Sequence, residues 1–460
     1  MSDVNQVHLE KLESLPEGWA ETTVSKIVQM ISTNKKKLAQ KNYLDKGDFP
    51  VVDQGQEFIA GYSNNEALII HGEPPFIVFG DHTRAFKFAN FNFVPGADGV
   101  KVMKSLEVDP KWCFYIFQAI KLPNKGYARH FQYLKEAYLP VPPPEQQKRI
   151  AAKIEELFSH IDAGIEALKK AKQLLKQYRQ SVLKAAVTGE LTKEWREANK
   201  DKLEPAPQLL ERILQERRHK WEEQQLEQFK AKGKLPKDDK WKGKYKEPEY
   251  GGDRFFSEIP DEWAIASIDQ LAWDVRYGSS SKTNDNEKGV PVLRMGNIVD
   301  GQLDYTNLKY LPKNHGEFPE LLLEDGDLLF NRTNSAELVG KTAVFRDIGR
   351  QASLASYLIR VRVVSGVEPD FVAYFINSSC GRNWIKSCVS QNVGQANVNG
   401  TKLKALVMPL PSLEEQKEIT RIVEDKMQSS DRLLVELDHQ LLKIEKNKLS
   451  VLASAFSGKV

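Results

Sequence analysis

The sequence has few cysteines, no long apolar stretch and little net charge. Its three cysteines, Cys113, Cys380 and Cys388, form no Cys-x-x-Cys pair, which argues against a zinc ribbon or a redox motif. Few, scattered cysteines suit a reducing compartment. No apolar run approaches the length of a membrane span, and residues 1–10 lack the apolar core of a signal peptide. We therefore expect a soluble, cytoplasmic protein with no membrane partner.

The motifs of the common enzyme classes are also missing. There is no GxxxxGK[ST] phosphate loop and no HExxH zinc motif. Glu73-Pro74-Pro75-Phe76 is similar to the Asp/Asn-Pro-Pro-Tyr/Phe motif of amino-methyltransferases. However, glutamate replaces the usual first residue, and no glycine-rich turn for S-adenosylmethionine precedes it. We expect a chain that is not an enzyme, has no catalytic residue and binds no metal or cofactor.

The charge is balanced overall but unevenly placed. The 460 residues carry 66 basic and 63 acidic side chains, a net charge of +3. Residues 192–250 carry 16 basic and 13 acidic residues and contain Leu209, Ile213 and Trp221 at helical spacing, which predicts a charged linker with a short amphipathic helix. The Lys- and Gly-rich stretch from Lys230 onward is typical of a flexible linker. The neutral total does not exclude a nucleic-acid partner, because basic residues can gather in loops.

The chain contains an internal repeat. Residues 15–20, with Trp19, match residues 259–264, with Trp263, at an offset of 244. Residues 139–150 match residues 408–419 at an offset of 269, and this second match continues without a gap toward the ends of both copies. Duplication explains both matches, since chance similarity rarely extends over about fifty residues. The bodies between the matched ends differ, and the second is longer.

Each repeat ends in a long predicted helix. After a proline-rich hinge, apolar residues recur at steps of three, four or seven from Ile150 to Val182 and again from Ile419 to Val451. Helices of about 40 residues would be about 60 Å long. A narrow apolar stripe on a long helix needs a partner helix, and each copy supplies one for the other. We expect an intramolecular antiparallel coiled coil; packing of each helix on its own body is the alternative.

The two bodies show a mixture of buried strands and short helices, separated by polar and basic loops. Arg, Lys, Asn and Gln side chains can bond base edges, and hydroxyl groups suit phosphate oxygens. The candidate nucleic-acid contacts of the first body are Lys35, Lys36, Lys37, Gln54, Gln56, His82, Thr83, Arg84, Lys125 and Arg129. Those of the second body are Arg276, Tyr277, Ser279, Ser280, Lys282, Arg294, Asn297, Arg332, Asn334, Ser335, Lys341, Gln395 and Asn397.

These features together resemble one family. The paired tryptophan-containing entries, the paired Pro-Val/Leu-Pro-x-x-Glu-x-Gln hinges at 140–147 and 409–416, and the helix ends at 186–196 and 455–460 are similar to the specificity (S) subunit of a type I restriction–modification system. Residues 79–84 and 326–332 support the same resemblance. The charged segment that follows the first helix has no counterpart after the second, which is a departure from a strict repeat.

The resemblance implies an α+β architecture: two mixed α/β target recognition domains joined by two long helices in an antiparallel coiled coil. The expected segments are 1–144 for the first recognition domain, 145–191 for its helix, 192–257 for the linker, 258–411 for the second recognition domain and 412–460 for its helix. Each domain would read one half of a bipartite double-stranded DNA site. The helices would set the spacing and dock two methyltransferase (M) subunits.

The resemblance also places all chemistry on the partners. M subunits would bind S-adenosylmethionine, and restriction (R) subunits would use ATP and Mg²⁺ for translocation and cleavage. Two alternatives stay open at this point: a stand-alone DNA methyltransferase built on residues 73–76, and a coiled-coil scaffold that does not bind DNA.

Overall fold

The fold is described from a computed structural model, in which residues 15–96, 99–123, 126, 129–234, 236, 238–250, 259–335, 337–392 and 395–456 are described. The chain divides into two compact units. Unit 1 comprises the chain up to Ala171 together with the part from Glu436 onward, and unit 2 comprises Lys172–Val435. The boundary divides both long helices, α4 (Pro144–Val187) and α11 (Leu413–Ala455), so each unit contains a part of each helix.

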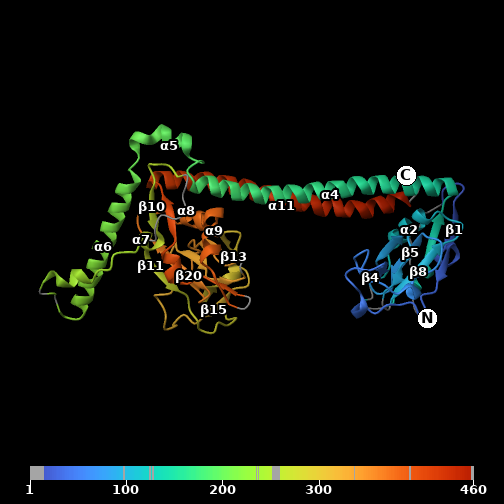
Figure 1. Ribbon diagram of the computed structural model, residues 1–460, viewed down its shortest axis with the longest axis horizontal. Coiled ribbons are helices and arrows are strands. Elements are labelled where there is room, and N and C mark those ends of the chain that lie inside the picture. Colours follow the sequence, from blue (N-terminus) through green and yellow to red (C-terminus); the bar gives the residue numbers. More distant parts are fainter. Residues whose placement is uncertain are drawn as a thin grey trace. The chain divides into compact units, whose positions relative to one another are not determined.

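The body of unit 1 contains a four-stranded sheet in the order β2-β8-β5-β6, a three-stranded sheet β4-β3-β7 and the pair β1-β9. Strands β1, β4, β5 and β8 of this body are labelled in Figure 1. Its elements are β1 (Ala20–Thr23), α1 (Val24–Ile27), β2 (Val28–Ile31), η1 (Gln40–Asn42), β3 (Phe49–Val52), β4 (Gly61–Ser63), η2 (Glu66–Leu68), β5 (Phe76–Gly80), β6 (Phe86–Ala89), β7 (Val94–Pro95), β8 (Val100–Ser105), α2 (Pro110–Ala119), α3 (Phe131–Lys135) and β9 (Tyr138–Val141).

The body of unit 2 contains a four-stranded sheet in the order β11-β20-β16-β18, a three-stranded sheet β15-β12-β19 and the pair β10-β23. Its elements are α5 (Lys193–Asn199), η3 (Lys200–Lys202), α6 (Ala206–Ala231), η4 (Asp239–Lys244), β10 (Ala264–Ser267), α7 (Ile268–Leu271), β11 (Ala272–Tyr277), β12 (Val290–Leu293), η5 (Met295–Asn297), β13 (Ile298–Val299), β14 (Gln302–Leu303), β15 (Lys309–Leu311), β16 (Leu328–Asn331), β17 (Thr333–Asn334), β18 (Thr342–Val344), β19 (Ser353–Leu354), β20 (Leu358–Val363), α8 (Pro369–Asn377), α9 (Ser379–Cys388), β21 (Ser390–Asn392), β22 (Gln395–Asn397), α10 (Gly400–Lys404) and β23 (Val407–Leu410).

The two bodies share one topology, although their sequences differ. Strands β2, β8, β5 and β6 of unit 1 follow the same order as β11, β20, β16 and β18 of unit 2. The three-stranded sheets also agree, since β3 pairs antiparallel with β4 and parallel with β7, as β12 does with β15 and β19. Among the described residues, the β13-β14 hairpin, helix α9 and the β17-β22-β21 sheet are found in the second body alone. The duplication therefore extends through the bodies.

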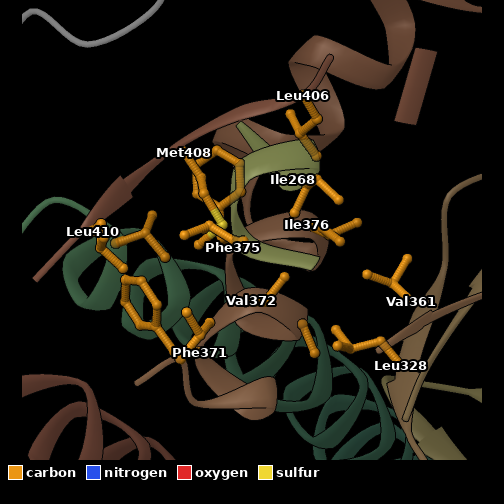
Figure 2. Close-up of a cluster of buried hydrophobic side chains, with 14 of the residues drawn as sticks. Ile268, Leu328, Val361, Phe371, Val372, Phe375, Ile376, Leu406, Met408 and Leu410 are labelled. Carbon is orange, nitrogen blue, oxygen red and sulfur yellow. The ribbon is translucent and has the colours of Figure 1, made fainter. Parts of the chain in front are cut away.

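Each body buries one face of its helix α2 or α8 against the four-stranded sheet. In unit 2 the buried face of α8 includes Phe371, Val372 and Phe375, which belong to the same core cluster as Leu328 and Val361 from the sheet (Figure 2). The spacing of one, three and four residues is that of a helix with one apolar face. In unit 1 the corresponding helix α2 buries Trp112, Cys113, Ile116 and Phe117.

Each core also contains the last turns of a long helix that begins in the other unit. In unit 2, Val182 and Ala186 near the end of α4 belong to the same core as Trp263. In unit 1, Phe456, which directly follows α11, packs edge-on against Trp112 with ring centroids 6.4 Å apart. Both long helices are thus held at both ends by apolar burial, the main stabilising term in folding.

Within each unit the two long helices run antiparallel, which confirms the coiled-coil prediction. In unit 1, Lys448 Nζ donates to Asp162 Oδ1 at 2.5 Å, and the Ile444 side chain lies beside Gly164. In unit 2, Arg179 of α4 forms an ion pair with Asp431 of α11. Positions that advance along α4 therefore meet positions that recede along α11.

The glutamine of each hinge motif fastens the start of a long helix to the body. Buried Gln147 accepts a hydrogen bond from the Asp109 backbone N–H at 2.7 Å and donates to the Pro142 carbonyl at 2.8 Å. Gln416 accepts from the Glu368 N–H at 2.8 Å and donates to the Pro411 carbonyl at 3.0 Å. Each glutamine thus satisfies an N–H beside the start of α2 or α8, which explains its recurrence in the two hinges.

The segment after α4 is fixed by one buried carboxylate. Glu415, 1% exposed, accepts hydrogen bonds from Thr192 Oγ1 (2.7 Å), Arg196 Nη1 (2.6 Å) and Trp263 Nε1 (2.9 Å). Gly189 has a φ of +80°, and a Cβ there would lie 2.4 Å from Pro260 Cγ. Gly189, two residues after the end of α4, therefore adopts a conformation that favours glycine and lets the chain pass close to Pro260.

The charged segment is more structured than its composition predicts. Helix α6 has 26 residues and buries Leu209 and Ile213 in the core of unit 2. Beyond it, Trp241 stacks on Trp221 with ring centroids 6.0 Å apart, and Phe229 meets Trp241 edge-on. The prediction of a flexible linker from Lys230 is wrong for residues 238–245, because these aromatic contacts hold η4 against α6. The predicted division into five segments stays a prediction.

Candidate nucleic-acid interface

Three of the predicted loops of the second body meet at one edge of the four-stranded sheet. The Arg332 guanidinium lies over the Tyr277 ring, 5.0 Å from its centroid. Arg332 Nη1 donates to Asn397 Oδ1 at 3.3 Å, and Arg332 Nε donates to the Ser356 carbonyl at 2.9 Å. Residues 277, 332 and 397, far apart in the sequence, therefore form one cluster of side chains with base-reading chemistry.

The backbone around this cluster is tightly specified. Thr333 of β17 pairs with Asn397 of β22, which sets the two loops in register. Tyr277 Oη accepts a hydrogen bond from the Gly400 N–H at 2.6 Å at the start of α10. A Cβ on Gly278 would lie 2.4 Å from the Ala355 carbonyl oxygen, so only glycine permits this approach of two backbones.

Tyr357 is a residue of this edge that the sequence did not single out. Its carbonyl accepts a hydrogen bond from the Arg332 N–H at 3.0 Å, and its side chain is 50% exposed. Tyr277 is 43% exposed. No pattern in the sequence places Tyr357 beside Arg332.

The other predicted residues of the second body differ in accessibility. Those with exposed side chains are Arg276, Ser280, Lys282 and Ser335, and those with half-buried side chains are Arg294, Asn334 and Lys341. Ser279 is buried and donates to Glu317, while Asn297 is buried and bonded within its own loop. Gln395 lies in β22, and its side chain is outside the described part of the structure.

In the first body, two predicted loops meet beside the end of β5. Thr83 Oγ1 donates to the Gln54 carbonyl at 2.5 Å, and the His82 N–H donates to Gln54 Oε1 at 3.4 Å. Arg84 has a φ of +61° and an exposed side chain, and Gln56 is also exposed. The structure therefore brings residues 54, 82 and 83 together and leaves Arg84 and Gln56 open to solvent.

Asp81 connects this edge to the loop before α3. Its carboxylate accepts the Phe131 N–H at 2.7 Å, and its carbonyl accepts the His130 N–H at 2.9 Å. Arg129, directly before His130, is exposed. Lys125, from the same predicted loop, lies outside the described residues.

The three predicted lysines at 35–37 follow β2. Lys36 Nζ donates to the Ile69 carbonyl at 2.5 Å, so its ammonium is engaged within the fold. Lys35 and Lys37 have exposed side chains, and Lys35 has a φ of +62°.

The loops of the two bodies correspond in position. The first body has polar loops after β2, β3 and β5 and before α3, and the second has them after β11, β12 and β16 and before α10. Because β2 and β5 both run antiparallel to β8, their carboxyl ends lie at the same edge of the sheet, and β11 and β16 are related to β20 in the same way. Each predicted loop of one body therefore has a counterpart in the other, with different residues.

The described residues offer no site for a metal ion and no helix that could span a membrane. No group of three or more His, Cys, Asp or Glu side chains there is placed to hold a metal ion. Among the helices described, none is long and apolar enough to span a membrane. Glu73, the first residue of the methyltransferase-like motif, is exposed and lies 3.5 Å from Lys104 Nζ.

Known proteins share both the sequence pattern and the fold. The type I restriction enzyme EcoKI specificity subunit of Escherichia coli (strain K12) is 27% identical over 324 residues, which cover 70% of this chain and 57% of that subunit. The chain thus spans little more than half the length of this relative. The type I restriction enzyme StySPI specificity subunit of Salmonella potsdam is 23% identical over 475 residues, covering 97% of this chain and 90% of that one.

A similar fold is found in a chain of one solved structure. That structure is described as the structural basis of complex assembly and conformational transition of the type I R-M system. The TM-score is 0.63 at 15% identity, and the match covers 97% of this chain and 100% of the other. The sequence model of the family described as type I restriction modification DNA specificity domain matches residues 16–175 and 260–443. Since this match includes both repeats and most of the sequence, the chain belongs to the type I restriction modification DNA specificity domain family.

Proposed function

We propose that this chain is the non-catalytic subunit that gives a type I restriction–modification complex its DNA sequence specificity. Each body is a target recognition domain that reads one half of a bipartite double-stranded DNA site. The observation that carries this proposal is the correspondence of the loops: two bodies of one topology present different polar residues at the same sheet edge. A duplicated scaffold with divergent loops suits two different half-sites, as paired domains with a fixed separation do in other DNA-binding proteins.

The side chains at the two edges have the chemistry that direct reading requires. In the second domain, Arg332 and Asn397 offer the donors and acceptors that bond guanine and adenine edges in the major groove. In the first domain, Gln54, Gln56 and Arg84 have the same capacity. Exposed Ser280, Lys282 and Lys35 suit phosphate oxygens, which position a protein on DNA. All the predicted contacts remain proposals at the level of single residues.

The paired long helices serve, in this proposal, as the spacer between the two half-sites and as the docking surface for two M subunits. Leu442 and Leu449 of α11 are one heptad apart and 59% and 68% exposed. Apolar side chains at this spacing lie on one helix face, and such exposed stripes mark interaction sites. The M subunits would carry S-adenosylmethionine, and R subunits would carry ATP and Mg²⁺.

Selection of DNA by the assembled complex tests the proposal. The chain is co-purified with its M subunits and mixed with a library of random duplexes, and the retained DNA is sequenced. We expect two short conserved blocks separated by a constant number of unselected base pairs. Failure of the chain to associate with M subunits, or retention of DNA without any shared sequence, would contradict the proposal. Neither the methyltransferase nor the scaffold alternative gains support from the known relatives.

A further inference from the structure

A lysine is buried in the sheet of the first domain. Lys87 lies in the middle of β6 and is 5% exposed. Its Nζ donates to the Asp53 carbonyl at 2.8 Å and to the Glu57 carbonyl at 2.5 Å, and it lies 3.5 Å from Asp53 Oδ1. All three acceptors belong to residues 53–57, the loop that carries Gln54 and Gln56. One ammonium group therefore bonds both ends of this loop.

The burial of Lys87 is unfavourable by itself. Loss of hydration lowers the pKa of the Lys87 ammonium, while the negative charge of Asp53 acts in the opposite direction. A buried charge persists where partners satisfy its hydrogen bonds. The partners here are two backbone carbonyls and one carboxylate, so the favourable interactions that offset burial are the ones that fix the shape of the loop.

The fold does not need a lysine at this position. Lys87 pairs with Val78 of β5, and in the second domain the corresponding pair is Ala343 with Leu329 of β16. Ala343 is fully buried. A small apolar side chain thus occupies the corresponding position in the sheet of the second domain. The lysine of the first domain is therefore explained by its bonds to the loop and not by a requirement of the sheet.

The second domain holds its corresponding loop with a different residue. Asn297, 4% exposed, follows β12 as Asp53 and Gln54 follow β3. Its Nδ2 donates to the Asp304 carbonyl at 2.7 Å and to the Thr306 carbonyl at 3.1 Å, and its Oδ1 accepts the Arg294 N–H at 2.9 Å. Its amide group is engaged within the loop, which makes Asn297 a support for Arg294.

We infer that Lys87 and Asn297 are positioning residues for sequence recognition, each fixing the loop after the corresponding strand of its own domain. The anchor differs between the domains while the scaffold stays the same, so each loop adopts its own shape at the same edge. This inference rests on the proposed function. It also departs from the sequence-based expectation for Asn297, which becomes a residue that acts through its loop and not by touching DNA.

The test uses two complexes, each containing the full chain with its M subunits, with Lys87→Met in one and Asn297→Leu in the other. Binding is measured on the selected duplex and on duplexes altered in one half-site at a time. Each variant should lose discrimination in one half only, by about tenfold, and the two variants should affect opposite halves. Affinity for unrelated DNA and assembly with M subunits should stay unchanged, because the scaffold is intact.

Lys104→Met is the matched control, since Lys104 lies on β8 of the same sheet, is half-buried and pairs with Glu73 outside the 53–57 loop. It should leave both halves unaffected. Asp53→Asn weakens the same anchor without leaving a buried amine unpaired, and should give a smaller loss in the same half as Lys87→Met. This second variant decides the matter if Lys87→Met does not fold.

Hydrogen exchange separates this inference from the proposed function. Amides of residues 53–57 should exchange faster in the Lys87→Met chain, whatever DNA the complex binds. Unchanged exchange in that loop, or equal loss at both half-sites, would overturn the inference. A wild-type complex that selects no split sequence would overturn the proposed function instead.

Discussion

The Arg332 guanidinium lies 5.0 Å from the centroid of the Tyr277 ring, on an edge where Asn397 also bonds the same guanidinium. A cation above an aromatic face is held in place by the charge distribution of the ring. The side chain is only half-buried, so its remaining donors can reach a ligand. This arrangement makes Arg332 the most specific candidate for reading a base in the second domain.

Replacement of Arg332 by alanine should relax recognition in one half-site. A bidentate arginine contributes about 1 to 3 kcal/mol of discrimination against a wrong base. We therefore expect a loss of about tenfold to a hundredfold in preference at one or two base pairs, with the other half-site unchanged. Competition binding with single-base variants measures this. Arg350→Ala, an exposed arginine elsewhere in the same domain, is the matched control and should change neither half.

Replacement of Glu415 by alanine should destabilise unit 2. The carboxylate is bonded to Thr192, Arg196 and Trp263, so truncation leaves a charge and an indole N–H without their acceptor. Removal of one partner of a buried pair costs about 3 to 5 kcal/mol. Urea denaturation, followed by hydrogen exchange at amides of β10 and α8, reports the change in the stability of this unit.

Gln146→Ala is the control at the corresponding position of the first repeat. Gln146 is exposed and accepts one hydrogen bond, from Trp19 Nε1 at 2.9 Å. We expect a cost of about 1 kcal/mol or less. Equal effects of the two substitutions would show that the Glu415 network adds nothing beyond the tryptophan contact.

Lengthening the paired helices should change only the spacing of the half-sites. Asp162 meets Lys448, so residues near Leu168 of α4 lie opposite residues near Leu441 of α11. One heptad inserted after each of these leucines preserves the apolar stripe and adds about 10 Å, or about three base pairs. The selected DNA should keep both half-sites with a longer gap. Altered half-site sequences would contradict the division of roles.

The stability of unit 2 should respond to the titration of Asp370. Burial raises the pKa of the Asp370 carboxyl, and Arg346, which donates a hydrogen bond to it, opposes this shift. A raised folded-state pKa means that the folded protein holds the proton more tightly. The contribution of this group is therefore greatest at acid pH and declines as pH rises from its unfolded pKa, about 3.9, through the folded value.

Asp370→Asn removes that titration. The difference in unfolding free energy, wild type minus variant, should be largest near pH about 4 and should shrink toward neutrality. Urea midpoints of both proteins across this range measure the difference. A difference that grows as pH rises would show that the ion pair with Arg346 outweighs burial.

Much of the helical part could be predicted from the sequence. The first long helix was expected at 145–191 and spans Pro144–Val187, and the second was expected at 412–460 and ends at Ala455. Apolar periodicity and proline hinges are local signals, so they can be recognised in a single sequence.

The shared topology of the bodies was not visible in the sequence. Corresponding strand positions carry residues as different as Lys87 and Ala343, because one anchors a loop and the other only fills the core. Likewise, Trp241 stacks on Trp221 because the chain turns back toward α6 after that helix ends. Amino-acid composition does not predict this contact. The candidate loops were predictable from their residue types, whereas the clustering of Tyr277, Arg332 and Asn397 required the strand order.

The central claim is that one chain supplies both halves of a split DNA sequence through two like-folded domains. Mapping methylated adenines in the DNA of cells that carry this chain and its M subunit tests it most directly. The account predicts one motif of two short blocks with a constant gap, absent from cells without the chain. A single uninterrupted motif, or the same methylation with and without the chain, would contradict it.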